Sequence, residues 1–83
     1  MIAYRIVLMK PARKFIEKQT QHIREQLLRA IYQLPHKGNI KTLAGRENVY
    51  RLRVGSYRII YSIHNEVLTI EVMNVGNRGD IYK

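Results

Sequence analysis

The chain has 83 residues, no cysteine, and 15 lysines and arginines against six aspartates and glutamates, which gives a formal net charge of +9. This length fits one domain, and the lack of cysteine excludes a disulfide framework, a thiol nucleophile and thiolate zinc sites. The excess of cations is larger than solubility requires of a small domain, so the expected partner is a polyanion, with nucleic acid preferred over a membrane. We predict a single cytoplasmic domain over residues 1–83 that does not associate with membranes.

The N-terminal part of the chain predicts a strand followed by a helix. Residues 2–8 are mostly apolar and partly β-branched, which is typical of a strand and unlike a signal peptide. Pro11 fits the first turn of a helix, where its missing N–H leaves no hydrogen bond unmade. We therefore expect the first helix over residues 11–18.

A second helix should begin after Thr20, which is a good N-cap residue. Within it, apolar side chains recur at spacings of three and four, as expected for one buried face; they are Ile23, Leu27, Ala30, Ile31 and Leu34. Pro35 and Gly38 end this helix. The polar segment over residues 36–48 is expected to be a loop.

After that loop the apolar pattern changes to a period of two, which predicts three antiparallel strands over residues 50–54, 57–63 and 67–75. Gly55-Ser56 forms the first turn between them, and Asn65-Glu66 lies in the second. The predicted order is β-α-α-β-β-β. This is an α+β fold in which the helix pair packs on one face of a four-stranded, mainly antiparallel sheet.

A two-residue turn at Gly55-Ser56 also sets the strand register, with Arg53 opposite Arg58 and Arg51 opposite Ile60. One sheet face is then apolar and should be the floor beneath the helices; it carries Leu52, Val54, Tyr57, Ile59, Tyr61, Ile63, Leu68, Ile70 and Val72. The other face is polar and basic; it carries Arg51, Arg53, Arg58, Ile60, Ser62, His64, Thr69, Glu71 and Met73.

Arg53 and Arg58 form a like-charged pair across the predicted hairpin. Such pairs are destabilising by roughly 0.2–1 kcal/mol, and a phosphate bound between the two guanidinium groups would relieve the repulsion. The alternative is that the arginine stems lie over apolar neighbours such as Ile60 and Met73 while their charged heads are simply solvated.

Two segments of the chain resemble RelE toxins: YRLRVGSYRIIY over residues 50–61 and VGNRGDIY over residues 75–82. The likeness also covers the helix pair and so spans nearly the whole chain. It implies a RelE-like fold and the toxin role in a type II toxin–antitoxin system. The activity that it implies is an endoribonuclease that cuts mRNA in the A site of the 30S ribosomal subunit. The partner that it implies is an acidic antitoxin protein.

In RelE toxins the RNA-cutting site consists of basic residues around the glycine turn together with an arginine and a tyrosine near the end of the chain. The matching residues here are Arg51, Arg53, Arg58, Arg78 and Tyr82. The implied reaction is attack of a ribose 2′-hydroxyl on the adjacent phosphate, without a metal or another cofactor. Further contacts to RNA are expected from Lys10, Arg13, Lys37, Lys41 and Arg46.

The identity of the general base is left open by the sequence. The family often has lysine where this chain has Arg51 and Arg53, and arginine effectively never loses its proton. Tyr82 either stacks on a base or transfers a proton. His64 is expected to be a solvated turn residue, and Glu71 is a minor catalytic candidate.

Two other functions are compatible with the same fold, since fold alone does not determine function. One is a ParE-like inhibitor that binds DNA gyrase, and the other is an RNA-binding module without catalysis. The pairing of Arg78 with Tyr82 favours the nuclease. His22 and His36 have no second ligand at a suitable spacing, so no metal site is predicted.

Overall fold

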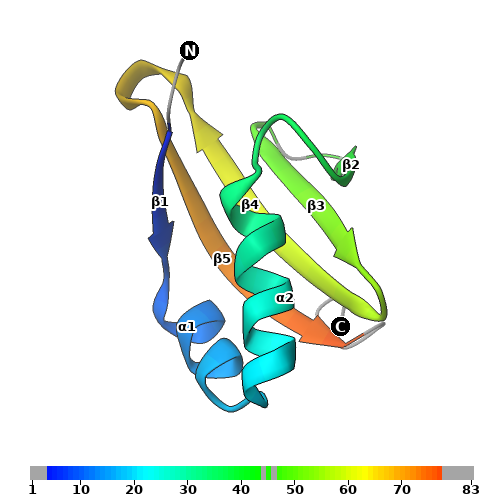
Figure 1. The fold of residues 1–83 in the computed structure, drawn as a ribbon. Coiled ribbons are helices and arrows are strands. Elements are labelled where there is room, and N and C mark those ends of the chain that lie inside the picture. The colour runs from blue at the N-terminus through cyan, green and yellow to red at the C-terminus, as the bar shows by residue number, and fades with distance from the viewer. Residues whose placement is uncertain (1–3, 44, 46, 78–83) are drawn as a thin grey trace.

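The computed structural model describes residues 4–43, 45 and 47–77, which form two helices and one five-stranded sheet (Figure 1). A short 3-10 turn, Asn65–Val67, joins the last two strands. The elements in chain order are β1 (Arg5–Leu8), α1 (Lys10–Glu17), α2 (Gln21–Tyr32), β2 (Asn39–Thr42), β3 (Val49–Val54), β4 (Tyr57–His64) and β5 (Thr69–Asn77). The sheet order is β1-β5-β4-β3-β2, in which β1 runs parallel to β5 and the other pairs are antiparallel.

The predicted α+β class is confirmed, because the helix pair covers one face of a mainly antiparallel sheet (Figure 1). The prediction of four strands was wrong, since β2 lies within the segment expected to be a loop. This edge strand is only four residues long and Ile40 is its one apolar residue, so it lacks the alternation that marks a half-buried strand. Its pairing with β3, which the sequence pattern does not reveal, makes it a strand.

The helices begin where the sequence predicts. Pro11 lies in the first turn of α1, and Thr20 is the N-cap of α2. The Ile23 N–H donates to the Thr20 hydroxyl oxygen at 3.4 Å, which satisfies one of the backbone donors left free at a helix start. The apolar face of each helix packs against the sheet, through Ala12 and Ile16 in α1 and through Leu27 and Ile31 in α2.

The hydrophobic core lies between the two helices and the sheet. Its buried side chains come from both helices, from the segment after α2 and from the three central strands; they are Ala12, Ile16, Leu27, Ile31, Leu34, Leu52, Ile59, Tyr61, Ile70, Val72 and Val75. The predicted apolar floor is confirmed except at Leu68, which is 42% exposed. Leu68 has a positive φ of 47° and directly follows the 3-10 turn as its C-cap residue, so its side chain is not part of the core.

A β-bulge changes the alternation of side chains along β5. Ile60 pairs with Asn74 while its neighbour Tyr61 pairs with Val72, so Met73 is an extra residue on β5. Because of this insertion, Val72 and Val75 both lie in the core. The bulge lies beside the strand that carries Arg58.

Tyr61 brings a polar atom into this core. Its ring stacks on that of Tyr50, with the ring centroids 5.6 Å apart. Its hydroxyl is buried and has no hydrogen-bond partner among the described residues. Burial, with a smaller contribution from the Tyr50 phenol, raises the pKa of Tyr61 to about 12.

We expect Tyr61→Phe to raise the free energy of unfolding by about 1 kcal/mol at neutral pH, because it removes an unsatisfied buried hydroxyl and keeps the ring. Unfolding in guanidinium chloride measures this change. The pKa of Tyr61 is 10.0 without the burial and about 12 in the fold, so the unfolded chain releases this proton first. Wild-type stability therefore falls between pH 10 and pH 12, and the advantage of the phenylalanine variant should widen there. A less stable Tyr61→Phe variant would show that the hydroxyl is well bonded.

Candidate nucleic-acid interface

The β3–β4 hairpin carries Arg51, Arg53 and Arg58 on one face of the sheet. The two helices cover the opposite face (Figure 1). The observed register is the predicted one, with Arg53 opposite Arg58 and Arg51 opposite Ile60. Gly55 has a φ of 58° in the first turn position, a conformation that favours glycine and permits the two-residue turn. Side chains alternate along a strand, so these arginines project away from the buried floor of the core.

A pocket of about 270 Å³ lies at the tip of this hairpin and is lined by Arg53, Gly55, Ser56 and Arg58. On β5, Arg58 faces Gly76, which is buried and has no side chain. The pocket thus combines two guanidinium groups with a hydroxyl and has no carboxylate in its lining. This chemistry fits an oxyanion such as a phosphate, because guanidinium forks bind phosphate oxygens in pairs.

The unexpected strand β2 adds a fourth cation to the same face. Lys41 pairs with Arg51 across β2 and β3, just as Arg53 pairs with Arg58 across β3 and β4. Lys41, Arg51 and Arg53 form no ion pair with a carboxylate of the residues that the structure describes. We call the set of Lys41, Arg51, Arg53 and Arg58 the basic corner. Because two like-charged pairs lie side by side, the basic corner has a high positive electrostatic potential that attracts polyanions.

The basic corner supplies positive charge and hydrogen-bond donors but no conventional proton acceptor. Neither its four cations nor the neighbouring Ser56 is a carboxylate or a histidine. Within the described part of the chain, no three His, Asp or Glu side chains gather in a way that could hold a metal ion. What the corner can do is bind a phosphate and stabilise extra negative charge on it.

The other residues predicted to contact RNA lie elsewhere. Lys10 and Arg13 are exposed on α1, in the helix layer on the opposite side of the sheet from the arginines. Lys37 follows α2 and lines a separate pocket of about 470 Å³ with Tyr32, Gln33 and His36. Only Lys41 joins the arginines. Arg46, Arg78 and Tyr82 lie outside the described residues, so their part in the site stays a prediction.

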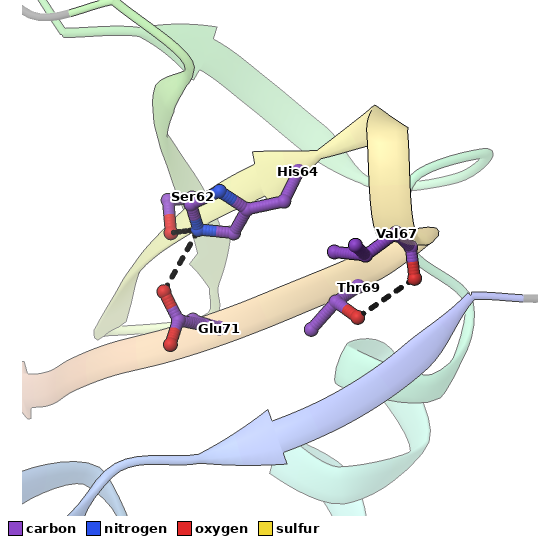
Figure 2. Close-up of polar contacts among 5 residues, drawn as sticks. All are labelled: Ser62, His64, Val67, Thr69 and Glu71. Carbon is purple, nitrogen blue, oxygen red and sulfur yellow. Dashed lines mark hydrogen bonds and ion pairs between the residues drawn. The ribbon is translucent and has the colours of Figure 1, made fainter.

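His64 is more than a solvated turn residue, although its side chain is 45% exposed. Its Nε2 atom lies 2.8 Å from Glu71 Oε1 and 3.1 Å from Ser62 Oγ (Figure 2). Six positions along β4 separate it from Arg58, about 20 Å at roughly 3.3 Å per residue, so it is remote from the basic corner as expected. Ser62 and Glu71 are cross-strand partners. The sequence could have indicated this cluster only if the register between β4 and β5 had been known.

Neither described helix is long and apolar enough to cross a bilayer. No curated protein matches the chain by sequence. Several solved structures do match it, and all of those compared below are toxin–antitoxin complexes.

The chain is similar to a subunit of the RelBE2 complex of Mycobacterium tuberculosis, with 26% identity, a TM-score of 0.79 and coverage of 96% of this chain and 97% of that chain. It is similar to one in the RelE-RelB complex of Pyrococcus horikoshii, with 25% identity, a TM-score of 0.76 and coverage of 96% and 99%. The RelB-RelE complex of Methanococcus jannaschii gives 30% identity, a TM-score of 0.74 and coverage of 92% and 94%. The model of the ParE toxin of type II toxin–antitoxin systems matches residues 6–82. The chain therefore belongs to the ParE toxin family, within the superfamily of type II toxins that ParE shares with RelE.

Proposed function

We propose that this toxin is an endoribonuclease that cleaves mRNA in the A site of the 30S ribosomal subunit and so stops translation in the cytoplasm. The observation that carries the proposal is the basic corner, where Arg53 and Arg58 line the pocket at the hairpin tip and Lys41 and Arg51 form a second cationic pair on the neighbouring strands. The net charge of +9 attracts the chain to RNA in general. The pocket at the hairpin tip would hold one particular phosphate.

The reaction that fits this corner is an internal transfer at phosphorus. The ribose 2′-oxygen bonds to the phosphorus while the bond from phosphorus to the 5′-oxygen breaks, which leaves a 2′,3′-cyclic phosphate and a 5′-hydroxyl. Arg53 and Arg58 would hold the nonbridging oxygens and stabilise the negative charge that develops on them. The 2′-hydroxyl must also lose a proton and the 5′-oxygen must gain one. The resemblance to RelE toxins places Arg78 and Tyr82 at the same site. Arg78 would bind the phosphate, and Tyr82 would either stack on a base or transfer one of these protons.

Dependence on the ribosome follows from what the basic corner lacks. The pocket has no carboxylate or histidine among the described residues that line it, so we infer that the toxin gains much of its rate from a message that is held in a reactive geometry. We therefore expect free RNA to be a poor substrate. An antitoxin that covers the basic corner would silence the toxin, and several of the solved RelE relatives are complexes with RelB. We propose an acidic antitoxin, since acidic side chains would neutralise the corner.

We expect Arg53→Ala to lower mRNA cleavage and yet to raise the free energy of unfolding by roughly 0.2–1 kcal/mol, because it removes the like-charged pair with Arg58. Thermal unfolding at low salt measures the stability, and high salt should reduce the difference. Arg5→Ala is the matched control, since Arg5 is an exposed arginine on β1, at the far edge of the sheet. A loss of stability in Arg53→Ala would mean that Arg53 has a structural role.

The proposed function is tested in a translation extract by mapping the 5′ ends of mRNA fragments with and without the toxin. A supercoiling assay with purified DNA gyrase runs beside it, because the match to the ParE family model makes gyrase inhibition the second candidate. We expect new ends inside codons that occupy the A site, and unchanged gyrase activity. Inhibition of gyrase with intact mRNA would overturn the ribonuclease proposal and favour the alternative.

A further inference from the structure

A second polar cluster lies on the same open sheet face as the basic corner. Ser62 and Glu71 face each other across β4 and β5, and His64 follows two positions after Ser62 on the same face of β4. The imidazole reaches back along the strand and its Nε2 atom meets both side chains (Figure 2). The proposed reaction gives these three residues no role.

The hydrogen bonding leaves one donor and one acceptor of this cluster unused. A carboxylate only accepts, so the 2.8 Å contact requires that His64 Nε2 carries the proton and donates it to Glu71 Oε1. That nitrogen then has no lone pair to accept the Ser62 O–H, although Ser62 is only 6% exposed. Among the described residues, no other partner contacts the Ser62 hydroxyl or the second Glu71 oxygen. Of the two, the Glu71 oxygen is the one that a ligand could reach, because the Glu71 side chain is 38% exposed.

The cluster and the basic corner lie at opposite ends of the same face of β4. Arg58, Ile60, Ser62 and His64 alternate along β4 on the same face. Ile60 and Ser62 are only 7% and 6% exposed, so the accessible groups on this face are those at its two ends. Four positions separate Arg58 from Ser62, about 13 Å at roughly 3.3 Å per residue. A single RNA strand held by a phosphate at Arg58 and laid along β4 would therefore bring a base a few nucleotides away to His64 and Glu71.

We propose that Ser62, His64 and Glu71 form a subsite for one nucleobase of the message, away from the phosphate that is cut. The inference rests on the proposed ribonuclease function and adds base selection to it. The exposed imidazole face is a stacking platform of the kind that binds unstacked bases. The free Glu71 oxygen accepts from N–H donors on a base edge and repels the lone pairs of carbonyl groups. Guanine, with adjacent N1–H and N2–H donors, fits this edge best.

The test is cleavage of a pool of ribosome-bound messages that are randomised on both sides of the A-site codon, followed by sequencing of the ends. For the wild type we expect guanine to be enriched at one fixed distance from the cut by about tenfold or more, the effect of one good base contact. Glu71→Gln should abolish this enrichment. The glutamine NH2 group is a hydrogen-bond donor, so it cannot accept from the N1–H and N2–H groups of guanine. Its carbonyl oxygen can still accept from His64, so the fold is preserved.

Glu17→Gln is the matched control, because it removes the same charge from an exposed position on α1 in the helix layer. Ser62→Ala is a second variant, and it should weaken the enrichment without changing the net charge. Enrichment of guanine that survives in Glu71→Gln would overturn the inference, and so would a wild type without base preference at any fixed distance. In both cases the proposed cleavage would stand. A wild type that cuts no message would overturn the proposed function together with the subsite.

Discussion

Replacing Arg58 by alanine should lower the rate of mRNA cleavage by about 10²- to 10³-fold, which is the typical cost of removing one donor that stabilises transition-state charge. Arg58 lies at the centre of the proposed site, because it faces Arg53 on one side, faces Gly76 on the other and lines the pocket at the hairpin tip. The rate is measured in a single turnover on ribosomes that hold a defined codon in the A site.

Two further variants make the Arg58 result specific. Arg58→Lys keeps the charge and loses the planar fork, so its rate should fall between those of the wild type and Arg58→Ala. Arg5→Ala removes an equal charge from the far edge of the sheet and should cut at nearly the normal rate. Full cleavage by an Arg58→Ala variant would show that the hairpin tip is not part of the catalytic site. Each comparison requires a variant whose melting temperature is no lower than that of the wild type.

The largest effect on stability is expected from Leu27→Ala. Leu27 is fully buried on the face of α2 that packs against the sheet. Removing its side chain should cost about 2–5 kcal/mol through lost burial and a residual cavity. A domain of this size has a total stability of roughly 4–12 kcal/mol, so the variant would be close to unfolding at 37 °C. Guanidinium unfolding measures the loss.

Gln26→Ala is the control for Leu27→Ala, since Gln26 is the exposed neighbour of Leu27 on the same helix. A surface change of this kind alters stability by no more than about 0.5 kcal/mol. Equal stabilities of the two variants would mean that α2 is not packed on the sheet through Leu27.

Local signals in the sequence were sufficient to predict the helices and the central hairpin. Pro11 and Thr20 marked helix starts, and the period-two pattern with a Gly55-Ser56 turn placed Arg53 opposite Arg58. These features depend on residues that are close together in the chain. For the same reason, three of the four residues of the basic corner, Arg51, Arg53 and Arg58, could be placed together without the structure.

Features that depend on pairing between distant segments could not be predicted in this way. Strand β2 has one apolar residue and is a strand only because it pairs with β3. The sequence analysis therefore did not predict that Lys41 lies beside Arg51. The contact of His64 with Glu71 needs the register of β4 with β5, which a β-bulge shifts.

The chemistry of the ends made on the ribosome tests the proposed function most directly. Ribosomes assembled from purified components, with a labelled message in the A site, are mixed with the toxin, and both new ends are identified. A 2′,3′-cyclic phosphate and a 5′-hydroxyl inside the A-site codon are expected, because the 2′-hydroxyl is the nucleophile. A 5′-phosphate at the cut would contradict this reaction, and a message that stays intact at saturating toxin would contradict the ribonuclease itself.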